Sequence, residues 1–362
     1  MSDDILKLTS YFAERQRHGK RFVSDELLDL YAENSVATSV VLRGMAGFGP
    51  RHELRSDQSL SMSEDLPVAI AAVDTAEKMA GLAERAVGLM KRGLVTLERA
   101  RLAGPSTPVI PVIPVIPVIP ETAKLTVYVG RQERVSGRPA HRAVCDLLYH
   151  HGFASAAVFL GVDGTTRGQR HRAHFFSRNA TVPVMIIAVG AGARVAEVLP
   201  QLKLVLRDPL VTVERAQLCK RDGDLLTRPA ALPATDGAGR ALWQKLMVYT
   251  SEATLDDGEP IHRAIVRRLQ GTPESRGVTV LRGVWGFHGD HPPQGDKLIQ
   301  LGRQVPVTTI VVDSPDRIAA AFDVIDELTT RHGVVTAERV PALVSIDGGE
   351  RHGGTALGRF DP

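Results

Sequence analysis

The sequence predicts an α+β fold in which one β-α-β-β-α-β unit is used three times. Three recurring features lead to this prediction, because repeats in a fixed order indicate one structural unit. They are the six-residue stretches VTLERA (95–100), VTVERA (211–216) and VTAERV (335–340), the strand-like stretches KLTSYF (7–12), KLTVYV (124–129) and KLMVYT (245–250), and apolar runs that follow Pro67, Pro183 and Pro306. This order of elements is that of the ferredoxin-like unit.

The first half of each unit is expected to be a strand, a helix and a second strand. The helices are predicted in SDELLDLYAEN, PAHRAVCDLLYHHG and PIHRAIVRRLQG. Ser24 is the expected N-cap of the first helix, and Pro139 and Pro260 occupy the first turns of the others. Gly152 and Gly271 lie where a helix stops. The second strands then run into glycine-rich turns, in VVLRGMAGFG, AVFLGVDGTT and TVLRGVWGFHG.

The second half of each unit is expected to be a buried strand, a helix and a closing strand. The helix is clearest in SPDRIAAAFDVIDELTTRHG, where Ser314 caps, Pro315 takes the first position and apolar residues recur at helical spacing. Its counterpart in the first unit covers about residues 76–92. In the second unit, Pro200 is expected to kink or shorten the helix.

The domain boundaries follow from these units and from the segments between them. We expect repeats at 1–103, 122–219 and 241–343. The linker 104–121 contains PVIPVIPVIPVIP, whose proline at every third residue matches polyproline II and would span roughly 40 Å as a stiff spacer. It could also serve as a ligand for a partner domain. The linker 220–240 is expected to be flexible and the tail 344–362 disordered, because both are rich in glycine or other small and polar residues.

Composition narrows the classes of function. The net charge is +3 in 362 residues, so nucleic acid is disfavoured as a partner. No apolar stretch is long enough for a membrane span, and the start lacks the pattern of a signal peptide, which favours a cytoplasmic protein without membrane insertion. Cys145 and Cys219 stand alone and are interpreted as reduced thiols without a role in chemistry.

Charged residues at fixed positions predict structural ion pairs. Alternate residues of a strand share a face, so Lys7, Thr9 and Tyr11 lie together, opposite the apolar face that packs on the helices. In a ferredoxin-like unit the first and last strands are antiparallel neighbours. We therefore expect cross-strand ion pairs of roughly 0.2–1 kcal/mol each. The pairs are Lys7 with Glu98, Lys124 with Glu214, and Lys245 with Glu338. The three polar faces could also close against one another around a pseudo-threefold axis.

A second set of residues is a candidate for binding an anionic ligand. Backbone amides of the glycine-rich turns could cradle a phosphate, although glycine is also explained by turn geometry. The basic turns before the last strands could bind an anion, or could only complement helix dipoles. The arginines at the ends of the last strands could join copies or reach a ligand. The candidates are Arg43, Gly44, Gly47, Gly49, Lys91, Arg92, Arg99, Arg207, Arg215, Arg282, Gly283, Gly286, Arg331 and Arg339.

Other kinds of site have weaker support. Histidines gather after the second strands, at His52, His171, His174, His288 and His291, but no closed set of metal ligands accompanies them. No nucleophile motif or paired acidic dyad recurs on the framework, so we expect a protein that is not an enzyme and that has no cofactor.

Four motifs in order then resemble a known family. They are K-L-x-x-Y, L-R-G-x-x-G-F-G, S-E-D-L-P-V-x-I-x-x-V-D and G-L-V-T-L-E-R, all in the first repeat. Together they resemble the PII-like family of domain of unknown function 190, and the third repeat keeps more of the pattern than the second. The resemblance implies ferredoxin-like subunits that assemble as trimers, with clefts between subunits and a loop after the second strand.

For this chain the resemblance implies a single-chain pseudo-trimer that acts in signal transduction. The predicted function is sensing of a small anionic effector, an adenine nucleotide first among the candidates, at the clefts between repeats. The loops expected at about 49–65, 165–181 and 286–305 could contact a regulated protein partner. The alternatives are an interaction scaffold without a small-molecule ligand and a metal-binding protein.

Overall fold

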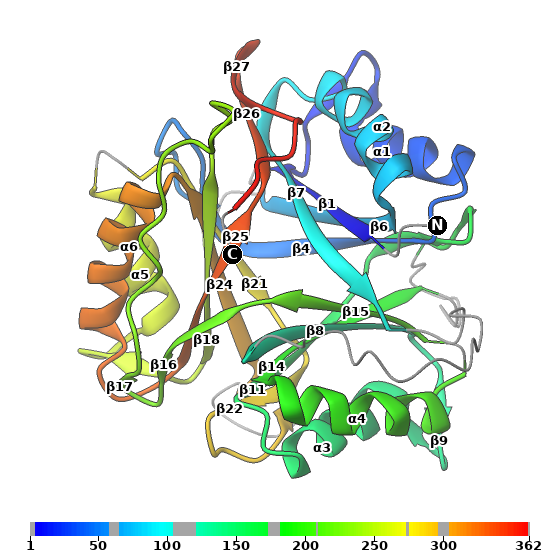
Figure 1. Cartoon of the computed structure of the whole chain (residues 1–362), viewed down its shortest axis with the longest axis vertical. Coiled ribbons are helices and arrows are strands. Elements are labelled where there is room, and N and C mark those ends of the chain that lie inside the picture. Colours follow the sequence, from blue (N-terminus) through cyan, green and yellow to red (C-terminus); the bar gives the residue numbers. More distant parts are fainter. Residues whose placement is uncertain are drawn as a thin grey trace.

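The computed structural model of the chain describes residues 4–57, 65–103, 121–172, 182–207, 209–272, 275–295 and 304–360 (Figure 1). The proline-rich spacer 108–120 and His174 lie outside these residues. Six helices and an antiparallel sheet of 21 strands confirm the predicted α+β class for the described part of the chain.

Each repeat contributes two helices and four main strands, the second of which is divided into two strands in the second and third repeats. The first consists of β1 (Asp4–Ala13), α1 (Val23–Glu33), β4 (Thr38–Phe48), β6 (Pro67–Thr75), α2 (Ala76–Gly88) and β7 (Arg92–Leu102). The second consists of β8 (Thr122–Gly130), α3 (Ala140–His150), β11 (Ser155–Leu160), β12 (Asp163–Thr166), β14 (Pro183–Ala191), α4 (Gly192–Val205) and β15 (Leu210–Arg215). The third consists of β18 (Trp243–Ser251), α5 (Ile261–Gln270), β21 (Val278–Arg282), β22 (Trp285–His288), β24 (Pro306–Asp313), α6 (Pro315–Leu328) and β25 (Val334–Val340).

Short strands complete the repeats. Two-residue hairpins precede the first helix of each repeat, namely β2 (Arg17–His18) with β3 (Arg21–Phe22), β9 (Arg134–Val135) with β10 (Arg138–Pro139), and β19 (Leu255–Asp256) with β20 (Glu259–Pro260). Three further strands pair with the ends of the second strands: β5 (Arg55–Ser56), β13 (Gln169–Arg170) and β23 (Gln294–Gly295).

Strand pairing is the same in the three repeats. The orders are β7-β1-β6-β4, β15-β8-β14-β11 and β25-β18-β24-β21, all antiparallel. Alternation along β1 turns Leu6, Leu8 and Phe12 toward the helices, where they join a core with residues of α1 and α2. The opposite face carries Lys7 and Tyr11 toward the other repeats.

Several helix ends differ from the sequence-based expectation. The first helix begins at Val23, so Ser24 lies within its first turn and Phe22 is the N-cap. Ser314 is an N-cap but makes no side-chain capping hydrogen bond. α2 ends at Gly88, before the predicted 92. The prediction that Pro200 shortens its helix is wrong, because α4 runs for 14 residues with Pro200 inside it.

The glycine-rich segments lie in strands that cross between repeats, so the expectation of simple turns is wrong. β4 continues through Gly44 and Gly47 and pairs with β21 of the third repeat. β12 of the second repeat pairs with β4, and β22 of the third pairs with β11 of the second. The contacts therefore pass from repeat to repeat in a closed cycle.

Glycine is required where these crossing strands approach each other. A Cβ at Gly47 would lie 2.4 Å from the carbonyl oxygen of Val278. A Cβ at Gly286, where φ is +152°, would lie 2.1 Å from the carbonyl oxygen of Ala156. These distances leave no room for a side chain, so the glycines allow the backbones of two repeats to meet.

The segments that follow the second and third repeats are also structured, which corrects two predictions. The linker expected to be flexible contains the end of β16 (Gln217–Arg221) and all of β17 (Asp224–Leu225), and β16 pairs with both β17 and β25. The tail expected to be disordered forms β26 (Ala342–Asp347) and β27 (Glu350–Gly354), and β26 pairs with β7 of the first repeat. Val344 and Ile346 bury their side chains in the core of that repeat, which accounts for the order of this segment.

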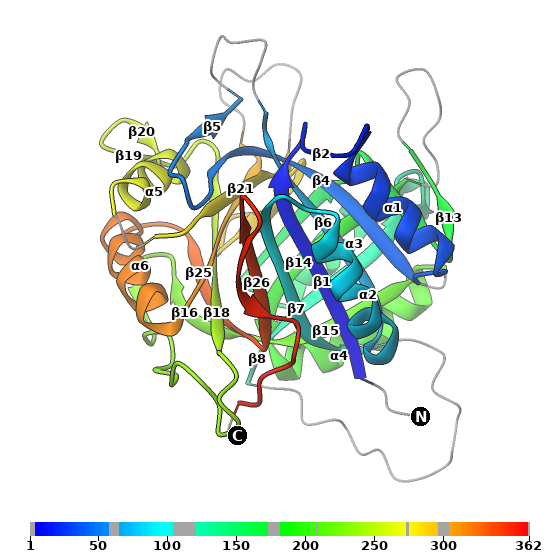
Figure 2. The same cartoon turned by 90° about the horizontal axis from the view of Figure 1, so that it is seen from above.

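The helices lie at three outer corners of the molecule, while the sheets face its centre (Figures 1 and 2). Each helical layer has its own apolar core, and a fourth core fills the space between the sheets. Tyr128 and Tyr249 enter this central core from different repeats. Among the residues described, no helix combines the length and the apolar character that crossing a membrane would need.

Candidate functional site

Six charged residues from the three repeats meet in the centre of the molecule. The first and last strands place Lys7 opposite Glu98, Lys124 opposite Glu214, and Lys245 opposite Glu338. All six side chains point from the sheets into the space between the repeats. They are 1–7 % exposed, and we call them the central ring.

Contacts in the central ring join different repeats as well as the two strands of one repeat. Nζ of Lys7 lies 3.1 Å from Glu98 of its own repeat and 2.5 Å from Glu214 of the second. Nζ of Lys124 lies 2.7 Å from Glu214 and also contacts Glu338. Lys245 contacts Glu98 and lies 2.8 Å from Glu338. Each lysine thus bridges at least two carboxylates, and the ring links all three repeats.

The electrostatics of the central ring keep Lys124 and Glu98 charged. Burial would lower the pKa of Lys124, but the three carboxylates outweigh burial and hold this pKa well above its ordinary value. Burial would raise the pKa of Glu98, yet the three ammonium groups hold it well below the ordinary value. At Lys7, by contrast, burial outweighs the attraction of Glu214 and Glu98 and lowers the pKa. The ring thus sets three lysines against three glutamates in a buried site.

The three carboxylates have the spacing of a metal site but do not fit a metal ion. Oxygens of Glu98, Glu214 and Glu338 lie within 4.8 Å of one another, and they are the one such group found among the described residues. The lysine ammonium groups already contact these oxygens and neutralise their charge. We interpret the ring as a structural junction.

A cleft lies at the junction of the first and third repeats. Its empty volume is about 1100 Å³, including the open mouth. The first repeat supplies Tyr11 from the end of β1 and Phe48 from the end of β4, and the third supplies Trp243, Ile310 and the strand β26. The crossing of β4 with β21 brings these segments together. The floor of the cleft is consequently aromatic and apolar.

Four arginines lie around this floor. Arg51 and Arg55 follow β4, Arg92 begins β7, and Arg276 precedes β21 of the third repeat. Guanidinium groups present several N–H donors in a plane and bind carboxylates and phosphates well. Arg55 lies 3.0 Å from the carboxylate of Asp65. The arrangement can bind an anion beside an apolar group.

A carboxylate from the tail that follows the third repeat enters the same cleft. Oδ1 of Asp347, at the end of β26, lies 3.3 Å from Nε of Arg51 and 3.3 Å from Nε of Arg92. Pairing of Asp347 with Arg92 in the β26–β7 register brings the three side chains together. Two arginines of the first repeat thus share one carboxylate of the tail.

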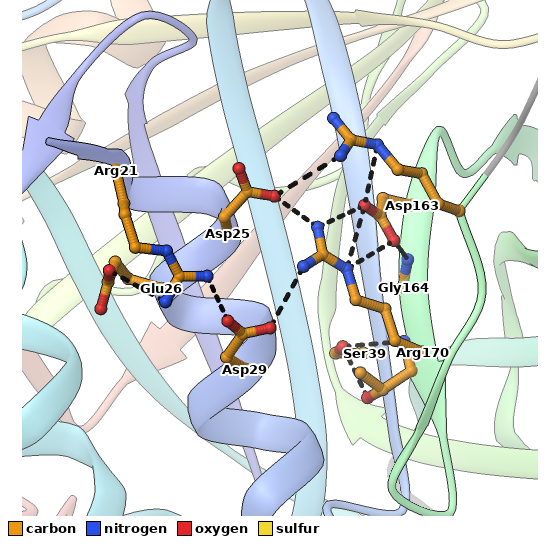
Figure 3. A network of polar contacts seen from close by, with 10 residues as sticks. Arg21, Asp25, Glu26, Asp29, Ser39, Asp163, Gly164 and Arg170 are labelled. Carbon is orange, nitrogen blue, oxygen red and sulfur yellow. Dashed lines mark hydrogen bonds and ion pairs between the residues drawn. The ribbon is translucent and has the colours of Figure 1, made fainter.

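The junction of the first and second repeats has a different chemistry. Figure 3 shows Arg170, from β13, between Asp163 of its own repeat and two carboxylates of α1. The nitrogen–oxygen distances are 2.7 Å to Asp163, 2.5 Å to Asp25 and 3.2 Å to Asp29. Burial would lower the pKa of Arg170, but hydrogen bonds to Asp163 and Asp25 raise it. The guanidinium group of Arg170 therefore joins the second repeat to the first.

At the junction of the second and third repeats, aromatic contacts are prominent. The guanidinium of Arg142 lies 4.2 Å from the centre of the Trp285 ring. The rings of Tyr149 and Phe287 meet edge to face with centroids 5.2 Å apart. The three junctions have diverged, although the strands that build them pair in the same way.

Only part of the predicted ligand-binding set lines the cleft, namely Gly47, Gly49 and Arg92. Arg43 is exposed and pairs with Glu14. Arg282 lies 2.7 Å from Glu252 and 3.0 Å from Asp57, so it joins the third repeat to the first. These last two arginines lie outside the lining of the cleft.

The other candidates are placed elsewhere. Gly44, Gly283 and Gly286 lie where strands approach closely. Five other basic candidates are exposed, namely Lys91, Arg99, Arg207, Arg215 and Arg331. Arg339 lies over the ring of Phe360, with 5.4 Å between the guanidinium carbon and the ring centre.

The loop histidines lie at different places. Nδ1 of His52 is 2.8 Å from the carbonyl oxygen of Gln270, at the end of α5. His288 pairs with Ser155 in the β22–β11 register, and its ring lies 5.3 Å from that of His291. Burial lowers the pKa of His288 to about 4, with further contributions from neighbouring histidines.

Sequence reasoning missed most of the cleft. Arg51 and Arg55 follow a recognised glycine-rich motif, and their proximity to it was an available signal. Trp243 and Asp347 gave no such signal, because they reach the cleft only through packing of the third repeat on the first. Because the tail was predicted to be disordered, Asp347 was not among the predicted site residues either.

The structure defines a class of protein: a chain of three similar α+β domains. The second strand of each domain pairs with that of the other two. The family profile DUF190, described as an uncharacterized ACR, matches residues 5–102, 122–218 and 243–342. The chain therefore belongs to the PII-like DUF190 family, in three tandem copies. It is also similar to a UPF0166 protein of Aquifex aeolicus (strain VF5), with 30% identity over 78 residues, which are 22% of this chain and 81% of that protein.

Proposed function

We propose that the chain is a non-enzymatic regulatory protein of the PII-like class, built as a pseudo-trimer of ferredoxin-like repeats within one chain. The strand order β7-β1-β6-β4 and its two counterparts support the ferredoxin-like assignment. The cycle of pairings β4–β21, β12–β4 and β22–β11 supports the pseudo-trimer. In this proposal the chain takes the place of three separate subunits.

The effector in this proposal is a small anionic molecule, first of all an adenine nucleotide, bound in the cleft between the first and third repeats. The observation that carries it is the pairing of an aromatic floor with an arginine rim in one cleft. Phe48 and Trp243 suit a planar ring, and Arg92 suits a phosphate.

Isothermal titration of the full chain with ATP, ADP, AMP, cyclic AMP and bicarbonate tests the proposed function. We expect at least one nucleotide to bind, and Arg92→Ala to weaken binding roughly tenfold or more, because a charge-assisted hydrogen bond is lost. Arg99→Ala is the matched control, since Arg99 is exposed on the same strand outside the cleft. If none of these compounds binds the wild-type chain, the proposed effector class is wrong.

A further inference from the structure

The hairpin formed by β26 and β27 is fixed at its base and open at its tip. Leu343, Val344 and Ile346 are 2–3 % exposed, so β26 is anchored by burial. At the tip, Gly348 and Gly349 both have positive φ, and the amide of Gly348 donates to the carbonyl oxygen of Lys91 at 3.1 Å. The tip therefore holds the preceding residue, Asp347, beside the basic turn of the first repeat.

The carboxylate of Asp347 occupies the place where an anion would meet Arg51 and Arg92. Its Oδ1 is buried and lies at 3.3 Å from both arginines, yet it makes no hydrogen bond of good geometry. The side chains are 34 % exposed for Asp347 and 48–49 % for the arginines, so solvent screens both ion pairs. The carboxylate neutralises the arginines without binding them tightly.

We propose that Asp347 is a built-in counter-ion, which an anionic group of the ligand displaces from Arg51 and Arg92. This inference rests on the proposed function and adds a regulatory element to the same cleft. A phosphate carries more oxygens than a carboxylate and can accept hydrogen bonds from both guanidinium groups. The tail thereby lowers the affinity of an anion site that belongs to the first repeat, and a ligand must outcompete Asp347.

The displacement requires only a local change. Since the apolar side chains of β26 remain buried, the side chain of Asp347 and the Gly348–Gly349 turn are the parts that need to move. The outer strand is attached separately, because Glu84 of α2 accepts a hydrogen bond from Thr355 at 2.7 Å and lies 3.3 Å from Arg351. The hairpin can therefore stay in place while the carboxylate turns away.

Titration of the full chain with inorganic pyrophosphate tests the inference directly. We expect Asp347→Asn to bind pyrophosphate on the order of tenfold more tightly than wild type, because two ion pairs no longer compete. Asp323→Asn is the matched control, since it removes the same charge from an exposed aspartate that also pairs with an arginine, Arg228. Adding Arg92→Gln to Asp347→Asn should abolish the gain. Asp347→Ser serves as a second variant, and circular dichroism checks folding.

Each outcome decides one point. Equal pyrophosphate affinity in wild type and Asp347→Asn, including no binding by either, overturns the inference. An equal gain in Asp323→Asn also overturns it, because the effect would then follow net charge alone. A gain confined to Asp347 variants supports it even if every nucleotide fails to bind, which would reject only the proposed effector. Nucleotide binding that is unchanged in Asp347→Asn supports the function and rejects the counter-ion.

Discussion

Replacement of Lys124 by methionine tests whether the central ring is needed in its complete form. Lys124 is 1 % exposed, and its Nζ lies 2.7 Å from Glu214, 3.7 Å from Glu98 and in contact with Glu338. Methionine retains an unbranched apolar side chain but removes the ammonium group. Three buried carboxylates then face two lysines, and one negative charge is left without compensation.

The expected loss of stability follows from this imbalance. Breaking a buried ion pair by removing one partner costs about 3–5 kcal/mol, because the remaining charge cannot regain its water shell. An exposed pair is worth about 0.2–1 kcal/mol. Since domains are commonly stable by about 5–15 kcal/mol, Lys124→Met should remove a large fraction of the free energy of unfolding.

Urea unfolding, followed by circular dichroism and tryptophan fluorescence, measures the effect through the midpoint and the slope. Lys78→Met is the matched control, because Lys78 pairs with Asp74 at 2.8 Å but its side chain is 36 % exposed. The control should lose less than about 1 kcal/mol. Adding Glu338→Met to Lys124→Met removes the unpaired charge and should recover much of the loss.

A loss below about 1 kcal/mol in Lys124→Met, similar to that of Lys78→Met, would refute this reasoning. It would mean that the carboxylates of the central ring take up protons or water at little cost. A double variant as unstable as the single one would show that shape, not charge balance, determines the stability of the ring.

Two further predictions concern pH and backbone contact. Burial lowers the pKa of His262 to about 4 from an ordinary 6.5, so its contribution to stability is complete above pH 6.5 and is lost as the pH falls toward 4, by up to about 3 kcal/mol. In His262→Leu the free energy of unfolding should fall less between pH 7 and pH 4, and an unchanged fall would contradict the assignment. Gly47→Ala should destabilise by about 1–3 kcal/mol, because its Cβ would meet the Val278 carbonyl oxygen, whereas Gly81→Ala, in open space on α2, should be neutral or stabilising by up to about 1 kcal/mol. Thermal denaturation distinguishes the two glycine variants.

The elements within one repeat could be predicted from the sequence because their signals are local. The apolar stripe after Ser314 and the alternation from Lys7 to Phe12 each arise from residues a few positions apart. The N-cap of α1 is Phe22 and not the predicted Ser24. Differences of one or two residues are common at helix ends. The class α+β and the threefold repetition follow from such signals.

The contacts between repeats could not be predicted in the same way. β26 gains its order from β7, which lies about 250 positions earlier in the chain, and no local pattern in SIDGGERHGG indicates that partner. The glycines of RGMAGFG allow a turn or a crossing strand equally well. Only the packing of the third repeat on the first decides between them.

The candidate site shows the same division. The antiparallel pairing of β1 with β7 accounts for Lys7 beside Glu98, but the link from Lys7 to Glu214 requires the position of another repeat. Arg92 was found because it belongs to a recurring basic turn. Trp243 and Arg276 come to the cleft from the third repeat and Asp347 from the tail, so the first repeat considered alone does not contain them.

The crossing of the second strands also bears on aggregation. Within the described residues, β4 is paired on one side with β6 and on the other with β12 and β21, so its backbone has partners on both sides. A repeat cut out of the chain would leave that outer side bare, and bare strand edges are sites of aggregation. Fusion supplies the missing neighbours at high effective concentration as soon as the chain is made. Covalent linkage of the repeats thus disfavours pairing between the strand edge of a repeat and another molecule.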